Sequence, residues 1–281
     1  LSNNNNTLTA LQRNRQYQPY FLSDHQKIYL LEHMTSEFLL DSDIKNICSS
    51  CTERIDFKKL NWKIYEDLGY RKFSGYAISS KWKTSREFFT HLFTSERQLD
   101  LRSLPADLRK MNNGSNIKFQ LLRDFKIFQA DEQTLINEKE FQFLYLGITP
   151  QDLRDFAHRA LKFGSRFEFG TVEFLRKNGF EIDDKLSVLT DWQLGAVLRL
   201  YVAYGYTQTS GTFLFAGKVP QVTTASLVEY LMHHSSVDNF HSLNQVLEKD
   251  YGIYLSPEKL RELTFKIKLH NSQIYFSDPD Q

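Results

Sequence analysis

The stretches YEDLGYRKFSG (residues 65–75) and YVAYGYTQTSG (residues 201–211) are identical at five positions and lie 136 residues apart. Extending the comparison without a gap to residues 35–75 and 171–211 gives nine identical pairs among 41. Unrelated stretches of ordinary composition would share roughly two or three. We infer that the chain contains an internal duplication.

Each quoted stretch predicts the end of a helix followed by a β-hairpin. Gly69 and Gly205 can adopt the positive φ that ends a helix. The Ser-Gly pairs at 74–75 and 210–211 predict turns between strands 70–73 and 76–79, and between strands 206–209 and 212–215. The helix before Gly205 is apolar on nearly all sides, which predicts burial. The helix before Gly69 is expected to be long and amphipathic, with an apolar face formed by Phe57, Leu60, Ile64 and Leu68.

The start of each repeat predicts a short helix. Thr171 is a suitable N-cap for a helix at 172–178 that ends at Gly179. The same Thr-x-Glu-Phe-Leu sequence begins at Thr35, so a second helix is expected there.

Three helices are expected after each hairpin. In the first repeat they begin with a capping box at Thr84 and Glu87 and continue at 103–111 and 117–128. In the second repeat they cover 226–233, 242–251 and a segment from Pro257, which Ser256 caps, and a strand is expected at 274–276. Helix, helix, glycine turn, helix and strand is the order of a winged helix-turn-helix unit.

The predicted fold class is therefore mainly α (α+β), with two tandem homologous units. Each unit combines helices, a short β-hairpin and a winged-helix-like three-helix package. Residues 1–20 are expected to form a polar arm or linker, residues 21–146 the first unit, and residues 147–281 the second.

Composition favours a globular protein of the cytoplasm. Hydrophobic residues make up 41% of the 281 positions and aromatic residues 14%, which is enough for packed cores. The chain has no apolar run near eighteen residues and no signal-peptide pattern, so no membrane association is expected. Its two cysteines fit a reducing compartment. Because the chain begins at Leu1, we expect it to be processed or to belong to a longer polypeptide.

The net charge of +1 creates no global attraction for polyanions, so only local clusters can indicate a nucleic-acid partner. Both predicted third helices have a basic excess that could contact phosphates. A solvated surface of mixed charge is the competing interpretation. The candidate residues are Lys118, Arg123 and Lys126 in the first repeat, and Lys259, Arg261, Lys266 and Lys268 in the second.

Residues 54–83 form the strongest local signal, with eight basic residues against three acidic ones. The equivalent segment 190–219 has only two basic residues and one acidic residue. Tryptophan and tyrosine alternate with the basic residues of the first segment, as on surfaces that bind nucleic acid. Alternatively, the rings form a core and the lysines keep its outer side soluble. The candidate phosphate contacts are Lys58, Lys59, Lys63, Arg71, Lys72, Lys81 and Lys83.

No motif predicts a catalytic or metal site. Cys48 and Cys51 have the spacing of half a zinc site, but a second pair of ligands is missing, so buried thiols are favoured. Phosphate-binding glycine loops, nucleophile elbows and metalloprotease motifs are absent from the sequence. We expect no cofactor and favour a non-catalytic protein, although a site built from distant residues stays open.

The leading functional hypothesis is a regulatory module that binds nucleic acid, with DNA preferred. The alternative is a protein-interaction scaffold within a larger assembly. Phosphate binding should weaken steeply with salt, whereas an apolar protein interface should not. An exposed aromatic patch at Tyr204, Tyr206 and Phe213 would favour the scaffold.

Overall fold

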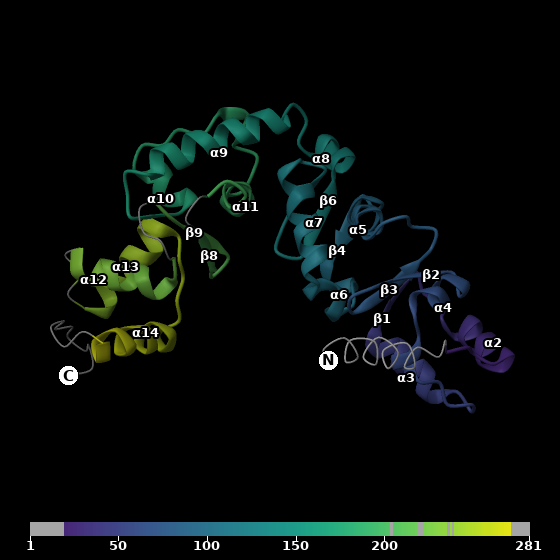
Figure 1. Cartoon of the computed structure of the whole chain (residues 1–281). Helices are drawn as coiled ribbons and strands as arrows, with labels where there is room; N and C mark the ends of the chain where they lie inside the picture. The colour runs from purple at the N-terminus through teal and green to yellow at the C-terminus, as the bar shows by residue number, and fades with distance from the viewer. Residues whose placement is uncertain (1–19, 203–204, 218–221, 235–236, 238, 271–281) are drawn as a thin grey trace, which may run out of the picture. The chain divides into compact units, whose positions relative to one another are not determined.

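The computed structural model describes residues 20–202, 205–217, 222–234, 237 and 239–270 (Figure 1). Its contacts divide the chain into two compact units, residues 1–89 and residues 90–281. The described part is mainly helical and contains three small antiparallel sheets of three strands each. The predicted arm is described only at residue 20, and the strand predicted at 274–276 lies outside the described residues.

Each of the three sheets is formed by the same series of elements along the chain. The series consists of a helix, a strand, two α-helices with a 3-10 helix before or between them, and two strands joined as a hairpin. In every sheet the third strand of the series lies between the other two. In unit 1 this series consists of α2 (Asp24–His33), β1 (Phe38–Leu40), α3 (Asp41–Ser50), a 3-10 helix (Phe57–Lys59), α4 (Trp62–Asp67), β2 (Tyr70–Phe73) and β3 (Tyr76–Ser79).

The second series begins with α5, which contains the boundary between the units, and the third lies within unit 2. The second consists of α5 (Ser85–Thr94), β4 (Gln98–Asp100), a 3-10 helix (Leu101–Ser103), α6 (Ala106–Lys110), α7 (Asn112–Arg123), β5 (Ile127–Gln129) and β6 (Thr134–Asn137), and α8 (Glu138–Leu144) follows it. The third consists of α9 (Pro150–Gly164), β7 (Phe169–Gly170), α10 (Val172–Lys177), a 3-10 helix (Asp184–Leu186), α11 (Asp191–Leu198), β8 (Tyr206–Thr209) and β9 (Thr212–Ala216).

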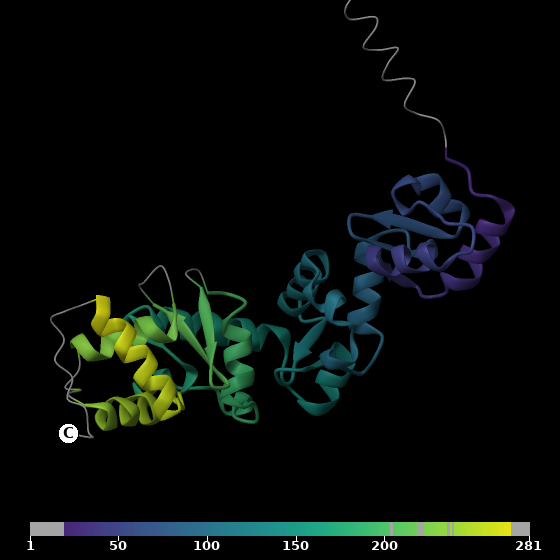
Figure 2. The same cartoon turned by 90° about the horizontal axis from the view of Figure 1, so that it is seen from below.

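Three helices complete unit 2, and Figure 2 shows them in green to yellow towards its C-terminal end. They are α12 (Thr224–His234), α13 (Phe240–Tyr251) and α14 (Pro257–His270), close to the predicted ranges. Gly252 ends α13 with φ +65°, and the Ser256 hydroxyl accepts a hydrogen bond from the Lys259 amide at 3.2 Å. The proposed repeat boundary at 146/147 falls between α8 and α9.

Both predicted hairpins are confirmed. The strands pair antiparallel from Tyr70 opposite Ser79 and from Tyr206 opposite Phe215. Gly75 and Gly211 have φ values of +88° and +75°, which a side chain would strain. The turns therefore have the conformation that their Ser-Gly sequences predict.

The helix predicted after Thr35 is wrong. Residues 38–40 form strand β1, whose Phe38 pairs with Ile78 of β3. The related sequence after Thr171 does form helix α10, which the Thr171 side chain caps at the Phe174 amide, 3.0 Å away. Strand pairing, rather than the local sequence, therefore decides the structure at 38–40, because in the third series β9 pairs with Phe169–Gly170 instead and residues 172–177 form a helix.

The long amphipathic helix predicted before Gly69 is also wrong. Leu60 is extended, and the Asn61 side chain accepts hydrogen bonds from the Lys63 and Ile64 amides, so that α4 begins only at Trp62. The helix predicted at 117–128 is α7 from Asn112 to Arg123, and the residues after it enter strand β5. The helix predicted at 103–111 is confined to α6.

The second and third series share one hydrophobic core. Phe128 of the second series and Phe141 of α8, which follows it, belong to the same cluster as Phe156 and Phe213 of the third series. The expected burial of the helix before Gly205 is confirmed for α11, whose residues from Gln193 to Leu198 are all buried, but the helix ends at Leu198 and not at Gly205 as predicted. Unit 1 has a core of its own. The α12–α14 region of unit 2 has a further core, which includes Leu214 of β9. None of the helices in the described residues has the length and apolar character needed to cross a membrane.

Candidate nucleic-acid interface

The fourteen basic residues predicted to contact nucleic acid are divided equally between the units. Seven lie in unit 1, on the 3-10 helix at Phe57–Lys59, on α4, and on or directly after the hairpin β2–β3. The other seven lie in unit 2, on α7, directly after α7, and on α14.

Four of the unit 1 residues have available charges. Their side chains are exposed and form no ion pair with any described residue of the chain. They come from successive elements that lie close in sequence, and α4 packs against β2. These four residues, called the open basic set below, are Lys58, Lys63, Arg71 and Lys83.

The remaining three lysines of unit 1 already have carboxylate partners. Lys72 lies 2.6 Å from Asp41 and is only partly exposed. Lys81 forms an ion pair with Glu37. Lys59 lies 3.9 Å from Asp56. Phosphate binding by these lysines would require exchange of an existing partner.

The aromatic residues of unit 1 only partly support the predicted stacking surface. Trp62, at the first position of α4, is 72% exposed and adjacent to Lys63. Tyr70 and Tyr76 are buried, as the core interpretation expects. The Tyr70 hydroxyl donates a hydrogen bond to the Ser36 carbonyl at 2.8 Å, so its role is structural. Among the rings of residues 54–83, Trp62 is therefore the exposed one beside the open basic set.

A groove of about 350 Å³ lies between the start of unit 1 and α4. Its walls include Lys27 and Lys63, but also Asp24 and Asp67. Two positive and two negative groups balance one another there. The groove therefore adds no net attraction for a polyanion to that of Lys63.

The basic residues near α7 are less accessible than their sequence suggests. Burial, and then the nearby Arg199 guanidinium, lower the pKa of Lys118. Lys126 lies beyond the helix, and its ammonium is 2.9 Å from a Glu138 carboxylate oxygen. Arg123 is exposed, with its guanidinium 5.9 Å from the centre of the Tyr201 ring.

The α14 residues form a network around one carboxylate. Lys266 and Lys259 donate hydrogen bonds to Glu262 at 2.6 and 3.0 Å. These bonds lower the pKa of Glu262 to about 2. Arg261 is exposed, whereas the side chain of Lys268 lies outside the described part. The network is typical of a solvated helix surface, the competing interpretation for this segment.

The polar surface of α7 was not predicted, because its side chains are uncharged and form no known motif. The solvent side of α7 carries Asn112, Asn116 and Gln120, all exposed. Their spacing of four residues, which places them on one side of a helix, was visible in the sequence. Amide side chains are donors and acceptors at once, so they can recognise bases as well as phosphates.

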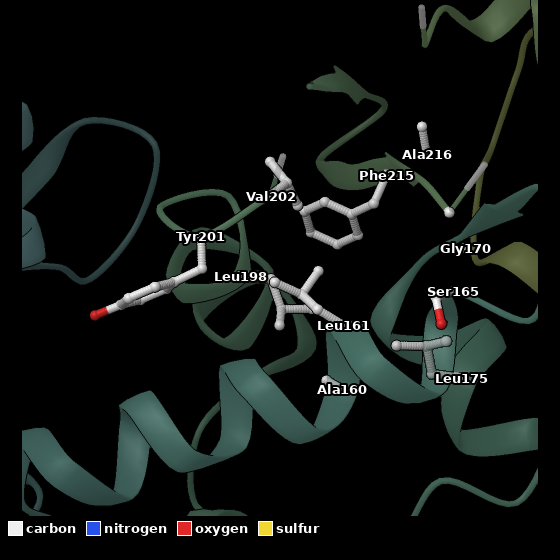
Figure 3. A pocket seen from close by; sticks show the side chains of 12 residues that line it. Ala160, Leu161, Ser165, Gly170, Leu175, Leu198, Tyr201, Val202, Phe215 and Ala216 are labelled. Carbon is white, nitrogen blue, oxygen red and sulfur yellow. The ribbon is translucent and has the colours of Figure 1, made fainter. Parts of the chain in front are cut away.

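An apolar pocket of about 160 Å³ lies in the third series, between α9, α10 and β9. Figure 3 shows Leu161, Leu198 and Phe215 facing it, while the Tyr201 ring directs its hydroxyl away from them. No titratable group other than this hydroxyl occurs among the described lining residues. The pocket's other side-chain hydroxyl, that of Ser165, donates a hydrogen bond to the Lys162 carbonyl at 2.8 Å.

Both cysteines are core residues. Cys48 and Cys51 are only 1% and 5% exposed and pack with Ile44 and Ile55 in the core of unit 1. Burial, and then the neighbouring Cys51, raise the pKa of Cys48 to about 11. The described residues contain no group of three side chains suited to hold a metal ion.

We expect the native thiols to react slowly with a disulfide reagent at pH 8 and rapidly once urea unfolds the chain, because only an exposed thiolate reacts. Unfolding returns the Cys48 pKa to about 9, so the unfolded state releases a proton above that pH while the folded state retains it. The stability that unit 1 has below pH 9 should thus decline towards pH 11, by less than about 3 kcal/mol. The absorbance of the reagent measures the labelling rate, and urea unfolding at several pH values measures the stability. Fast labelling of the native protein would contradict the first expectation, and a stability that does not decline above pH 9 would contradict the second.

Comparisons with protein-family models, with curated protein sequences and with solved structures find no match to this chain.

Proposed function

We propose that the chain is a non-catalytic regulatory module that binds DNA through winged-helix-like units. The proposal is supported by the recurring order of helix, strand, two helices and hairpin, with the third strand between the other two. Winged helix-turn-helix units have this order, and their third helix and hairpin approach the duplex. By this criterion the described residues contain three winged-helix-like units, at 24–79, 85–137 and 150–216, whereas the sequence predicted two, each formed by the three helices that follow a hairpin.

The single observation that carries the proposal is the open basic set of unit 1. Lys63 is on the third helix of the first series and Arg71 on its hairpin, the two elements that contact DNA in this type of unit. Lys58 and Lys83 flank these elements in the sequence. Four exposed cations with no carboxylate partner are available to neutralise phosphates and release counterions.

The test is the salt dependence of binding to a short fluorescent DNA duplex, measured by anisotropy. Four phosphate contacts predict that the logarithm of the association constant falls with the logarithm of salt concentration with a slope of about −3 to −4. Affinity should therefore fall by roughly a hundredfold between about 50 and 200 mM salt. A salt-independent affinity, or no binding at low salt, would refute the proposal.

The alternative function, a protein-interaction scaffold, is favoured by a different surface. Phe143 and Leu146, around the end of α8, are 73% and 91% exposed, and Leu144 between them is 47% exposed. Contiguous apolar residues of this kind mark protein contacts. The patch expected in the third series does not support it, because Phe213 is buried, Tyr206 is 40% exposed, and Tyr204 lies outside the described residues.

A further inference from the structure

We propose that the solvent side of α7 enters the major groove of duplex DNA and reads base pairs that contain adenine. This inference rests on the proposed function and deepens it, because it assigns sequence recognition to one helix of the second series. We call the surface formed by Asn112, Asn116, Phe119, Gln120 and Arg123 the α7 face.

The α7 face is a continuous stripe opposite the core side of the helix. Its five residues follow the spacing of three and four that places side chains on one side of a helix, and all are exposed. Gly114, Leu121 and Leu122 are buried on the other side. The helix has twelve residues, so about three turns present this stripe to solvent.

The chemistry of the α7 face matches base edges rather than phosphates alone. Asparagine and glutamine can donate to N7 and accept from N6 of adenine in one bidentate contact. Arg123 could bind guanine or a phosphate, and Phe119, which is 40% exposed, could contact the methyl group of thymine. Among the described residues, no hydrogen bond occupies the side chains of Asn112, Asn116 or Gln120.

The equivalent helix of the third series cannot perform this role. In α11 the residues from Gln193 to Leu198 are buried. Its amide residue, Gln193, donates hydrogen bonds to the Ala130 carbonyl at 3.0 Å and to the Tyr145 hydroxyl at 2.8 Å. Helix α11 thus also has a side-chain amide, but this amide forms hydrogen bonds that link the third series to the second.

The equivalent helix of the first series is less suited to read bases. Helix α4 has only six residues, and its last two, Glu66 and Asp67, are exposed carboxylates that DNA would repel. Its single basic residue, Lys63, suits contact with the DNA backbone at the beginning of the helix. Of the three equivalent helices, α7 alone exposes neutral amides along its length.

The charges around α7 favour a polyanionic partner over an acidic or apolar protein surface. Residues 102–126 contain six basic and two acidic residues, and Arg102 and Lys126 already pair with Asp100 and Glu138 outside this range, which leaves four basic residues against two acidic ones. One of the acidic residues, Asp124, is the C-cap of α7 and lies beyond the face. Arg109 is exposed before the helix and Arg123 at its last position, so a cation is available near each end for flanking phosphates.

The experiment uses the full chain and a pool of DNA duplexes with a randomised central segment, from which bound duplexes are enriched and sequenced. We expect enriched sites that share adenines at fixed positions and bind at least tenfold more tightly than unselected duplex. The double variant Asn116→Ala/Gln120→Ala should reduce this preference about tenfold or more, because each bidentate pair contributes about that factor. Affinity for unselected duplex should change less than about threefold.

The matched control is Gln245→Ala, which removes an exposed glutamine from the middle of α13 and should leave the preference intact. Circular dichroism of each variant should retain the helical signal of the parent chain. Salt-dependent binding without any enriched sequence, or enrichment unchanged in the double variant, would overturn this inference and leave the proposed function standing. Absence of duplex binding, or binding only to single-stranded RNA or to protein, would overturn both.

Discussion

Replacing Phe156 with alanine is expected to destabilise unit 2 by about 3–5 kcal/mol, the usual cost of a large cavity in a core. Phe156 is fully buried on α9, with its ring 6.0 Å from that of Phe180. Its cluster also includes Phe128 of the second series and Phe141 of the following helix α8. The cavity should therefore weaken both series, although the substitution lies in only one of them.

Urea unfolding followed by tryptophan fluorescence measures this loss. Trp62 and Trp82 lie in unit 1, and their replacement by phenylalanine leaves Trp192 to report on unit 2. In that background the substitution should lower the midpoint without changing the slope. Phe265→Ala, on α14, serves as the control because this ring is 64% exposed. Separate transitions for the second and the third series, with only one shifted, would contradict the shared core.

Local sequence predicted the structure correctly where the backbone itself imposes a requirement. Gly75 and Gly211 adopt positive φ in the hairpin turns, and Gly252 does so at the end of α13. Such positions depend on residues within one turn of chain, so no knowledge of distant contacts is needed. The hairpins and the α13–α14 boundary were predictable for this reason.

Elements that depend on distant partners were predicted incorrectly. Identical residues after Thr35 and Thr171 form a strand in one place and a helix in the other, because β3 pairs with residues 38–40 whereas β9 pairs with residues 169–170, before Thr171. Strands of two or three residues also have no periodicity of their own, which hid β1, β4 and β7. The alignment at a shift of 136 matches the hairpins of the first and third series, but not the elements before them.

The second series was not predicted from the sequence, because the turn of its hairpin contains no glycine. The turn between β5 and β6 uses the Asp131 carboxylate, which accepts hydrogen bonds from the Gln133 and Thr134 amides, each at 2.8 Å. This type of turn is common, but it gives a weaker signal than Ser-Gly. Charge counting likewise identified the segment that holds the open basic set, but not which of its lysines have carboxylate partners, because Asp41 and Glu37, the partners of Lys72 and Lys81, lie outside residues 54–83.

Replacing the three open lysines, Lys58, Lys63 and Lys83, with glutamine is expected to weaken DNA binding by about a hundredfold or more at low salt, because each phosphate contact contributes about 1 kcal/mol through counterion release. The slope of affinity against salt should decrease by about three. All three are exposed and form no ion pair in the described chain, so the folded state loses little.

A second variant with the same number and type of substitutions provides the control. Lys59, Lys72 and Lys81 lie in the same unit, but each has a carboxylate partner. Changing them to glutamine alters the net charge equally, so a purely global attraction would weaken both variants alike. If available cations bind the phosphates, the open-lysine variant should lose at least tenfold more affinity than the paired-lysine variant. Equal losses in two variants that melt at the same temperature would show that the open basic set is not the binding surface.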